Sequence, residues 1–412
     1  MAELPSSLQS PDLDELRSVH AAASELVRRT PTVTSRSLSR EFGGEIVLKA
    51  ENLQRTGSFK IRGALAKLRG VEPGSCRGVV AGSAGNHAQS LAFAAREAGL
   101  PCRVYMPATA PIGKFEAVEA FGGEAVRGGE SPIECIAAAR AAAEAEGLLF
   151  VHPFDDPDVI AGQAGVGIEL TEQVERLRRV VVPVGGGGLA SGVAIALKLA
   201  DPRIEVIGVQ AEGCSPMADS LRAGELVEAK ATRTIADGIA VKRPGELTLQ
   251  LIRSWLDGMV TVGDEAIAAA MVRLAERAKL VTEGAGAIGV AALMTGAVEP
   301  ADASEGATAV ILSGGNVDPR LLAAAINRHE ITASRRVRIS TLVPDQPGGL
   351  AGLLAAIATA GANILEVSHV RDLAELDLAQ TSVDLVLETR GPEHMAELRE
   401  RLAAAGYVIE AG

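Results

Sequence analysis

The sequence predicts an α/β protein with parallel sheets, followed by a smaller domain of βαββαβ order. Between residues 45 and 315, short β-branched runs alternate with longer Ala- and Leu-rich runs, usually across a glycine turn. This alternation is typical of parallel strands that helices cover on both faces. After residue 336 the apolar runs follow the order strand, helix, strand, strand, helix, strand, which is the ferredoxin-like order.

The first region is expected to hold seven strands with helices between them. The strands are expected at 45–49, 78–81, 103–106, 180–184, 205–209, 259–262 and 307–312. Helices are expected at 87–98, 133–145, 190–199 and 265–278. Ligands in such sheets bind at the carboxyl ends of the strands, so the residues after each strand are the first candidates for a site.

The polar stretch 328–336 marks a domain boundary, with a linker predicted at 331–336. Before it, residues 1–330 are expected to form the larger domain, with a small subdomain at about 54–155. After it, residues 337–412 are expected to hold four strands and two helices. The strands are predicted at 337–343, 363–371, 380–388 and 407–409, and the helices at 350–360 and 393–404.

Composition argues against several classes of function. Asp and Glu outnumber Lys and Arg by 52 to 40, the net charge is −12, and only 2% of residues are aromatic. Such a chain is a poor binder of nucleic acids and anionic membranes. The acidic N-terminus does not resemble a signal peptide, and no run of about 18 apolar residues occurs, so a cytoplasmic protein is expected. The four cysteines lack zinc-ligand spacing.

The motif VVVPVGGGGLASG at 180–192 joins an apolar run to four glycines and an Ala-rich run. Glycines let backbone N–H groups converge, and a helix N-terminus adds positive potential, so this junction suits a phosphate. The alternative is a flexible surface turn. No Lys-Ser or Lys-Thr pair follows, so this is not the nucleotide-binding P-loop.

A second glycine motif, GAGAIG at 284–289, matches the G-x-G-x-x-G sequence of the dinucleotide-binding fingerprint. A helix rather than a strand is expected before it, at 273–281, so the required context is missing. Close helix–helix packing is the preferred interpretation.

Lys60 lies in QRTGSFKIRGA, between Phe59 and Ile61, where a loop is expected to enter a helix. Apolar surroundings disfavour a charged lysine, which lowers the pKa of the amine and frees it for Schiff-base chemistry. The alternative is a lysine whose amine reaches the solvent from a helix surface.

Two further strand ends carry small polar residues. In AGSAGNHAQS, the residues before the expected helix offer N–H groups that can hold a carboxylate, although His87 by itself favours a packed or capping role. In AVILSGGN, Ser313 offers a hydroxyl that can meet a ring nitrogen or cap the next turn.

In chain order, SFKIRGA, SAGNHAQ, GGGGL, EGAGA and SGGN together resemble the motifs of fold type II pyridoxal-phosphate enzymes, the tryptophan-synthase-β type. Within these the chain is similar to threonine ammonia-lyases, also called threonine dehydratases. The match covers about residues 10–330. The tail, with DQPGGL at 345–350 and GANI at 361–364, resembles an ACT regulatory domain.

The resemblance implies a cofactor, pyridoxal 5'-phosphate, and the residues that hold it. Lys60 would bind it covalently and later carry the α-proton, Phe59 would pack against the ring, and Asn86 would bind the ring hydroxyl. Ser313 would face the ring nitrogen. Backbone groups of Gly185, Gly186, Gly187, Gly188 and Leu189 would hold the phosphate. Ser83, Ala84, Gly85, Asn86 and His87 would bind the substrate carboxylate.

The implied reaction is elimination of water from L-threonine, and from L-serine, to give 2-oxobutanoate or pyruvate and ammonia. A neutral Ser313 does not hold a proton on the ring nitrogen, which favours elimination over transamination. Two alternatives remain: a serine dehydratase or another β-eliminating or β-replacing enzyme of this fold, and a non-catalytic amino-acid sensor. A role in isoleucine biosynthesis is also implied, although the sequence does not separate it from degradation.

Two departures from the family pattern bear on the chemistry. Related serine racemases carry a serine where this chain has Ala84, so racemisation is disfavoured. Glu212 matches the glutamate of a family cation site, but the position six residues later is Ala218, which has no side-chain oxygen. A divalent metal is therefore not expected, and a monovalent cation near Glu212 stays open.

The ACT resemblance implies an amino-acid effector and a homo-oligomer, either a dimer or a tetramer. The effector site is expected at Asp345, Gly348, Gly349, Leu350, Asn363 and Ile364, where two tails meet. The alternative is a dimerisation domain that has lost its ligand.

Overall fold

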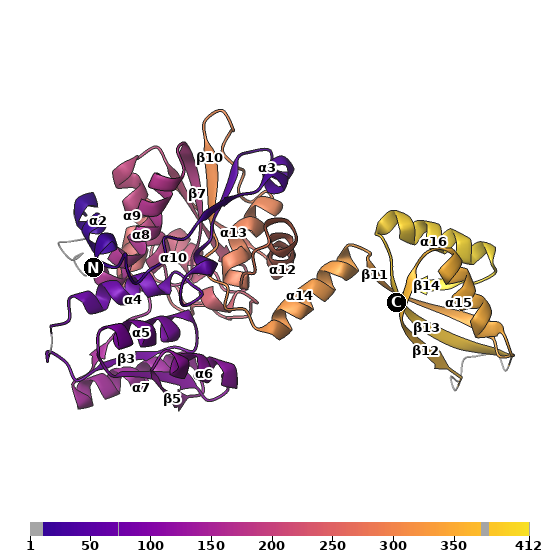
Figure 1. The fold of residues 1–412 in the computed structure, drawn as a ribbon, viewed down its shortest axis with the longest axis horizontal. Helices are drawn as coiled ribbons and strands as arrows, with labels where there is room; N and C mark the ends of the chain where they lie inside the picture. Colours follow the sequence, from indigo (N-terminus) through magenta and orange to yellow (C-terminus); the bar gives the residue numbers. More distant parts are fainter. Residues whose placement is uncertain (1–10, 73, 372–378, 412) are drawn as a thin grey trace. The chain divides into compact units, whose positions relative to one another are not determined.

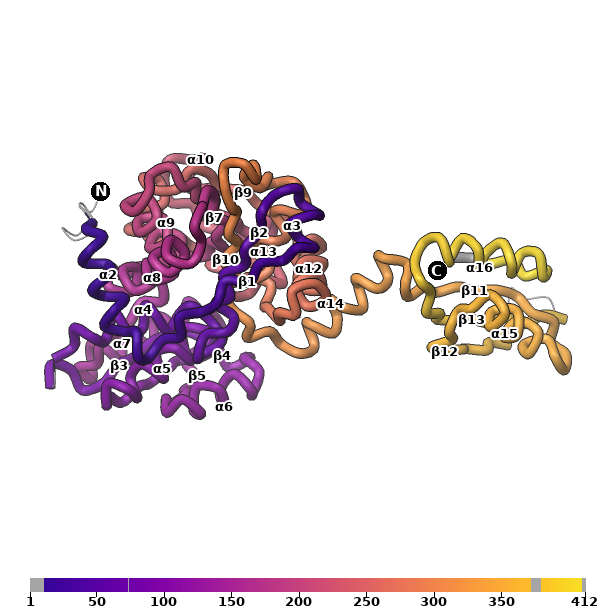
Figure 2. Tube along the Cα trace, turned by 45° about the horizontal axis from the view of Figure 1, so that its top comes forward, coloured from indigo at the N-terminus to yellow at the C-terminus, as the bar shows by residue number. Residues whose placement is uncertain are grey.

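The computed structural model describes residues 11–72, 74–371 and 379–411. The chain divides into two compact units, Met1–Leu321 and Leu322–Gly412, each described by itself below. Figure 1 and Figure 2 show the first unit in indigo to orange and the second in orange to yellow. Among the described residues, no helix is both long and apolar enough to cross a membrane.

The first unit contains a six-stranded sheet in the order β1-β2-β10-β7-β8-β9. Its strands are β1 (Thr32–Thr34), β2 (Ile46–Lys49), β7 (Leu177–Pro183), β8 (Glu205–Ala211), β9 (Gly258–Val262) and β10 (Ala307–Ile311). All neighbours are parallel except β1, which pairs antiparallel with β2. In the register, Val181 of β7 lies opposite Val310 of β10 and Ile207 of β8.

The second sheet of this unit is smaller and entirely parallel, in the order β5-β4-β3-β6. Its strands are β3 (Val79–Gly82), β4 (Cys102–Pro107), β5 (Glu124–Gly129) and β6 (Leu149–Phe150). The prediction missed β1, β5 and β6. The short β1 and β6, and the largely uncovered β5, do not show the apolar run of a buried strand.

Helices cover both faces of the sheets, as predicted for an α/β fold. They are α2 (Leu13–Ala22), α3 (Arg36–Phe42), α4 (Lys60–Arg69), α5 (Asn86–Glu97), α6 (Ile112–Ala120), α7 (Pro132–Glu146), α8 (Pro157–Gln173), α9 (Gly188–Ala200), α10 (Pro216–Ala223), α11 (Glu246–Trp255), α12 (Asp264–Arg273) and α13 (Gly284–Met294). The boundary between the two units falls within α14 (Pro319–Thr332). Side chains of α8, α9 and α11 share a core with β7, β8 and β10, while α13 packs on the other face of β7 and β10.

Two helical segments differ from the prediction. The helix expected at 265–278 is α-helical only to Arg273 and continues as a π-helix, Leu274–Ala278. The GAGAIG motif does open a helix without a preceding strand, but its glycines do not serve helix–helix packing. A Cβ at Gly286 would meet the backbone of Gly314, and one at Gly289 would meet Val310 of the sheet. The glycines therefore let α13 lie close to the sheet and its loops.

The second unit folds as predicted, in βαββαβ order. Its elements are β11 (Arg336–Pro344), α15 (Gly349–Thr359), β12 (Asn363–Val370), β13 (Gln380–Glu388), α16 (Pro392–Ala404) and β14 (Ile409–Ala411). The strands form one antiparallel sheet in the order β12-β13-β11-β14. Ile339, Leu353, Leu385 and Leu398 are among the residues of its separate core. Only 333–335 lie between α14 and β11, a shorter connection than the predicted linker 331–336.

Candidate active site

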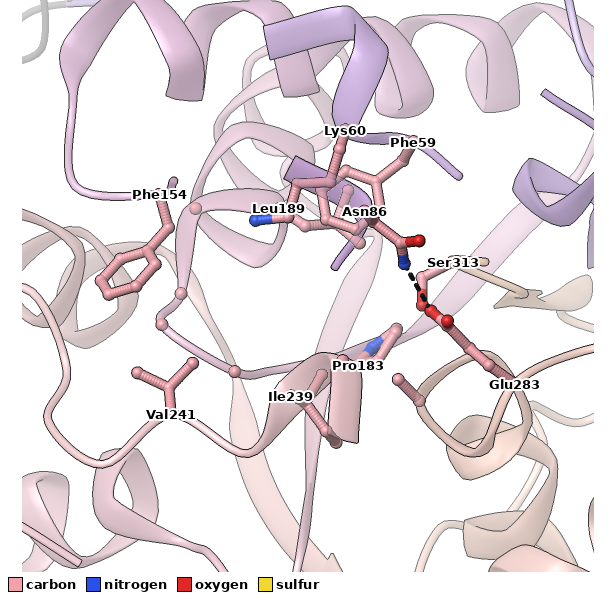
Figure 3. Close-up of a pocket in the computed structure, with 16 residues that line it drawn as sticks. Phe59, Lys60, Asn86, Phe154, Pro183, Leu189, Ile239, Val241, Glu283 and Ser313 are labelled. Atoms are coloured by element: carbon pink, nitrogen blue, oxygen red, sulfur yellow. Dashed lines mark hydrogen bonds between the residues drawn. The ribbon is translucent and has the colours of Figure 1, made fainter. Parts of the chain in front are cut away.

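A cavity lies where loops after strands of the large sheet meet the N-termini of helices α4 and α5 (Figure 3). Strands β7 and β10 are parallel neighbours, so their carboxyl ends meet at one edge of the sheet. The lining residues come from both parts of the first unit: Phe59, Lys60, Asn86, Phe154, Pro183, Gly185, Gly186, Gly187, Gly188, Leu189, Gly238, Ile239, Val241, Glu283, Ala285 and Ser313.

Lys60 is the first residue of α4, and its amine points into this cavity. Nζ donates a hydrogen bond to the carbonyl oxygen of Pro153 at 2.6 Å and lies 5.2 Å from the ring centroid of Phe59. Burial lowers the pKa of the Lys60 amine to about 8. The alternative of a surface lysine is therefore wrong, and a substantial neutral fraction of the amine is present near physiological pH.

The four glycines after β7 form a tight turn into α9. Gly187 has a φ of +100°, and a Cβ at Gly186 would lie 2.3 Å from the ring of Phe154. No side chain caps α9, so the N–H groups of its first turn remain available to an anion. Since Gly186, Gly187 and Gly188 are buried, the alternative of a flexible surface turn is wrong.

Residues that the sequence analysis did not single out hold this turn in place. The hydroxyl of Thr248, which is fully buried, donates to the carbonyl of Gly186 at 2.6 Å. The backbone N–H of Thr248 donates in turn to Asp155 Oδ1 at 3.0 Å. No motif near Thr248 could have indicated this contact, because Thr248 is 62 residues from Gly186 in the chain.

Asn86 is the first residue of α5, and both ends of its side-chain amide are bound. Its Nδ2 donates to Glu283 Oε1 at 2.8 Å, and its Oδ1 accepts a hydrogen bond from Asn316 Nδ2, also at 2.8 Å. Burial raises the pKa of Glu283 to about 7. Glu283 belongs to the EGAGA motif at 283–287, and a carboxyl group beside a glycine turn is the sequence signal that could have identified it.

Ser313 is buried two residues after the end of β10 and lines the same cavity. Its carbonyl oxygen accepts a hydrogen bond from the N–H of Phe59 at 3.1 Å. Of the expected carboxylate site, only Asn86 lines the cavity. Ser83, Ala84 and Gly85 lie between β3 and α5, where no side chain caps the helix. His87 is packed: its Nε2 lies 3.1 Å from the carbonyl oxygen of Val151, and burial lowers the pKa of its ring to about 3.

The remaining predicted residues lie elsewhere. Glu212 is exposed after β8, and no group of three or more His, Cys, Asp or Glu suited to a metal occurs within 11–72, 74–371 and 379–411. In the second unit, Asp345, Gly348, Gly349 and Leu350 join β11 to α15. Asp345 pairs with Arg371 at 3.1 Å. Asn363 binds Glu388 at 3.0 Å, and Ile364 packs against the core.

The fold and this site define an α/β enzyme that holds an anionic cofactor beside a reactive lysine. The residues fit pyridoxal phosphate, because the turn at Gly185–Gly188 leaves room and N–H groups for an anion. Lys60 offers an amine, and Asn86 and Ser313 offer polar groups in the same cavity.

Comparison with known proteins agrees with this class. The family model described as "Pyridoxal-phosphate dependent enzyme" matches residues 23–315. An L-threonine ammonia-lyase of Thermotoga maritima is 44% identical over 96% of this chain and 98% of its own. A solved structure of the threonine deaminase of T.th. is 41% identical and covers 75% of this chain and 99% of its own, with a TM-score of 0.70. Maize serine racemase is 34% identical over 78% of this chain and 98% of its own, with a TM-score of 0.72. The chain belongs to the family of pyridoxal-phosphate dependent enzymes, and its relatives within that family include L-threonine ammonia-lyases.

Proposed function

We propose that this chain removes water from L-threonine, and more broadly from L-serine, giving a 2-oxo acid and ammonia. The observation that carries the proposal is the meeting of the Lys60 amine and the four-glycine turn in one cavity. The relative that aligns over 96% of this chain is named an L-threonine ammonia-lyase, which supports threonine as the substrate.

Pyridoxal phosphate, when bound, supplies an aldehyde that condenses with amines and a ring that withdraws electrons from the substrate α-carbon. Lys60 would hold it through the side-chain amine, and the Gly185–Gly188 turn with the N-terminus of α9 would hold its phosphate. Phe59, Asn86 and Ser313 would face the ring. The residues that line the cavity in Figure 3 would surround it.

Once the substrate amine has taken its place, the freed amine of Lys60 would move the substrate α-proton. Its amine is desolvated and its pKa is lowered to about 8, so at neutral pH it exchanges a proton more readily than an exposed lysine. The Pro153 carbonyl, 2.6 Å from Nζ, orients the amine. The substrate loses its α-proton and its β-hydroxyl as water. A later hydrolysis takes up one water and releases ammonia. The net reaction therefore converts threonine to 2-oxobutanoate and ammonia with no net change in water.

The N-terminus of α5, with the backbone of Ser83–His87, is the proposed place of the substrate carboxylate. Gly85 precedes this helix without a side-chain cap, so N–H groups of the first turn can bind an anion. Ala84 has no proton to give to the opposite face of the substrate. This supports elimination rather than the racemisation named for the maize relative.

The second unit is proposed to be an ACT domain that binds an amino-acid effector near Asp345–Leu350 and Asn363–Ile364. Its ferredoxin-like topology supports this assignment. An effector would act by binding two states of the enzyme with different affinity. A homo-oligomer in the cytoplasm is part of the same proposal.

The test is release of oxo acid and ammonia from threonine, serine and O-acetylserine by the purified protein and by Lys60→Ala. Threonine and serine should react with the parent, because one methyl group in an apolar pocket changes specificity by only about 1–3 kcal/mol. Lys60→Ala should be inactive. Threonine turnover that survives in Lys60→Ala, or a preference for O-acetylserine, would overturn the proposal.

A further inference from the structure

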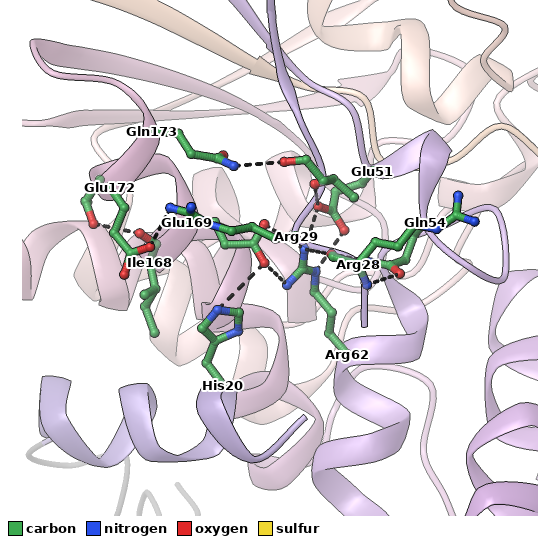
Figure 4. A network of polar contacts seen from close by, with 12 residues as sticks. His20, Arg28, Arg29, Glu51, Gln54, Arg62, Ile168, Glu169, Glu172 and Gln173 are labelled. Carbon is green, nitrogen blue, oxygen red and sulfur yellow. Dashed lines mark hydrogen bonds and ion pairs between the residues drawn. The ribbon is translucent and has the colours of Figure 1, made fainter. Parts of the chain in front are cut away.

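Four charged side chains are buried together outside the cavity: Lys49, Glu51, Arg62 and Glu169. Figure 4 shows Arg62 between Glu51 and Glu169. Lys49, Glu51 and Glu169 have no exposed surface, and Arg62 is 2% exposed. None of the four lines the cavity. Burying so many charges is costly unless each is paired and hydrogen-bonded, so the pairing within the cluster determines what it does.

Arg62 binds two carboxylates at once, each with two hydrogen bonds. Its Nε and Nη2 donate to the two oxygens of Glu51, both at 2.9 Å. Its Nη1 and Nη2 donate to the two oxygens of Glu169 at 2.7 and 3.0 Å. Such paired, charge-assisted hydrogen bonds fix the guanidinium plane in position and rotation, which a lysine amine does not do.

Lys49 completes the cluster from the end of β2. Its Nζ bonds to Glu169 and also donates to Gln173 Oε1 and to the carbonyl of Thr30, both at 2.8 Å. Two basic and two acidic groups therefore balance in charge. The carboxylate of Glu169 is itself held in place by Lys49, so it offers Arg62 a fixed partner on α8.

The cluster joins α4 to α8 at the turn that carries Lys60. Arg62 is two residues after Lys60, and Glu169 belongs to α8. The two helices touch closely, because a Cβ at Gly162 would lie 2.7 Å from the Cα of Gly63. The Lys60 amine binds the carbonyl of Pro153, in the segment just before α8. The position of α4 on α8 therefore sets where the amine lies relative to that carbonyl.

We propose that Arg62 is a positioning residue for Lys60. Its paired hydrogen bonds to the carboxylates of Glu51 and Glu169 fix the first turn of α4. The inference rests on the proposed function of Lys60. A buried ion cluster is by itself weak evidence for stability, since apolar side chains often serve as well. An apolar side chain does not provide the fixed orientation that the guanidinium gains from paired hydrogen bonds to two carboxylates. A reactive amine on the same helical turn requires such a fixed orientation.

The test compares Arg62→Lys with Arg103→Lys, a matched control. Arg103 also binds two carboxylates, Glu124 and Glu146, but it is part-exposed on β4 and does not line the cavity. For each folded variant, apoprotein is titrated with pyridoxal phosphate to obtain the Kd, and kcat and KM for threonine are measured on the loaded enzyme. The thermal unfolding midpoint is recorded alongside.

In Arg62→Lys the Kd for pyridoxal phosphate should rise and kcat should fall, each about tenfold or more, since a misplacement of about 1 Å can cost about a hundredfold in rate. KM should stay within about twofold, because the substrate carboxylate site is separate. Arg103→Lys should match the parent in Kd and kcat. A lower unfolding midpoint with unchanged Kd and kcat in Arg62→Lys would mean a structural role only and would overturn the proposal.

If Arg62→Lys does not fold, Glu51→Gln takes its place. This variant keeps the two hydrogen bonds from Arg62 to Glu169 and removes the negative charge of Glu51. In Glu51→Gln the Kd should rise and kcat should fall, each by a smaller factor than in Arg62→Lys. Unchanged Kd and kcat would overturn the proposal. The Kd measurement does not depend on which amino acid the enzyme converts. Failure of the positioning role is therefore distinguishable from failure of the proposed reaction.

Discussion

The amide of Asn86 donates a hydrogen bond to the carboxylate of Glu283 at 2.8 Å, across a sequence separation of 197 residues. Since Asn316 donates to the other end of the same amide, the orientation of Asn86 is fixed. One N–H of Asn86 remains for a group in the cavity. The Glu283 carboxyl that fixes this orientation is buried, so its protonation state affects both the hydrogen bond to Asn86 and the stability of the fold.

Replacing Glu283 should change how stability depends on pH. Burial raises the pKa of Glu283 from 4.5 to about 7, so the folded state binds this proton more tightly than the unfolded state. The free energy of unfolding contributed by this group is therefore highest at low pH and is lost as pH rises through this range. Glu283→Gln keeps a hydrogen-bond acceptor for Asn86 and has no titrating proton. Its free energy of unfolding should therefore not fall in this way as pH rises. Urea unfolding from about pH 5 to pH 8 measures it, with exposed Glu299→Gln as control.

The amine of Lys60 should titrate at about pH 8 in the apoprotein. Burial lowers its pKa to about 8. On the same helix, hydrogen bonds to Asp156 and Asp158 outweigh burial and raise the pKa of Lys67. Reductive labelling with pyridoxal phosphate across pH, read by peptide mass spectrometry, should show Lys60 reacting at lower pH than Lys67. Equal pH profiles for the two lysines would contradict the desolvated environment of Lys60.

Adding a methyl group to the glycine turn should weaken cofactor binding. A Cβ at Gly186 would lie 2.3 Å from the ring of Phe154, so Gly186→Ala must displace the ring or the turn. The Kd for pyridoxal phosphate should rise about tenfold or more, equivalent to at least about 1.4 kcal/mol. Gly113→Ala in α6 is the matched control, because nothing lies within 4 Å of its Cβ. That substitution should leave Kd unchanged and stabilise the helix by about 0.5–1 kcal/mol.

Introducing a hydroxyl at position 84 should create some racemisation. Ala84 has no exchangeable proton, whereas a serine there could donate one to the face of the substrate opposite Lys60. Ala84→Ser should form D-serine from L-serine at a measurable rate, while the parent forms none above background. Chiral chromatography of the reaction mixture measures it. Absence of D-serine in an active Ala84→Ser variant would show that residue 84 does not reach that face.

Removing the second unit should separate catalysis from regulation. Residues 1–332 contain the whole first unit and end with α14, before the βαββαβ fold of the second unit begins at β11. The T.th. threonine deaminase structure covers 75% of this chain. The truncated protein should keep threonine turnover and lose any response of the rate to isoleucine or valine. Full-length and truncated proteins are compared with and without each amino acid. An identical response in both would exclude effector binding by the second unit.

Local patterns determined much of the fold. Alternating apolar runs predicted the main strands and helices, because burial on a sheet face or helix stripe leaves a periodic pattern in the sequence. Short motifs after strands indicated the four glycines, Asn86 and Ser313, and a motif at a helix start indicated Lys60. All of these residues line the same cavity. The strands with weak patterns, such as β5, were missed because little of their surface is buried.

Only the tertiary structure decided which distant residues meet. Thr248 at Gly186, Glu283 at Asn86, and Glu51 and Glu169 at Arg62 are all contacts between residues on different elements. A single buried threonine or glutamate carries no periodic signal, and its partner depends on how the helices and loops pack. The sequence by itself determined which residues could do chemistry, whereas the packing of α4 on α8 and of α13 on the sheet decided how they are held. The physical reason is that hydrogen-bond geometry and desolvation arise only after distant segments come together.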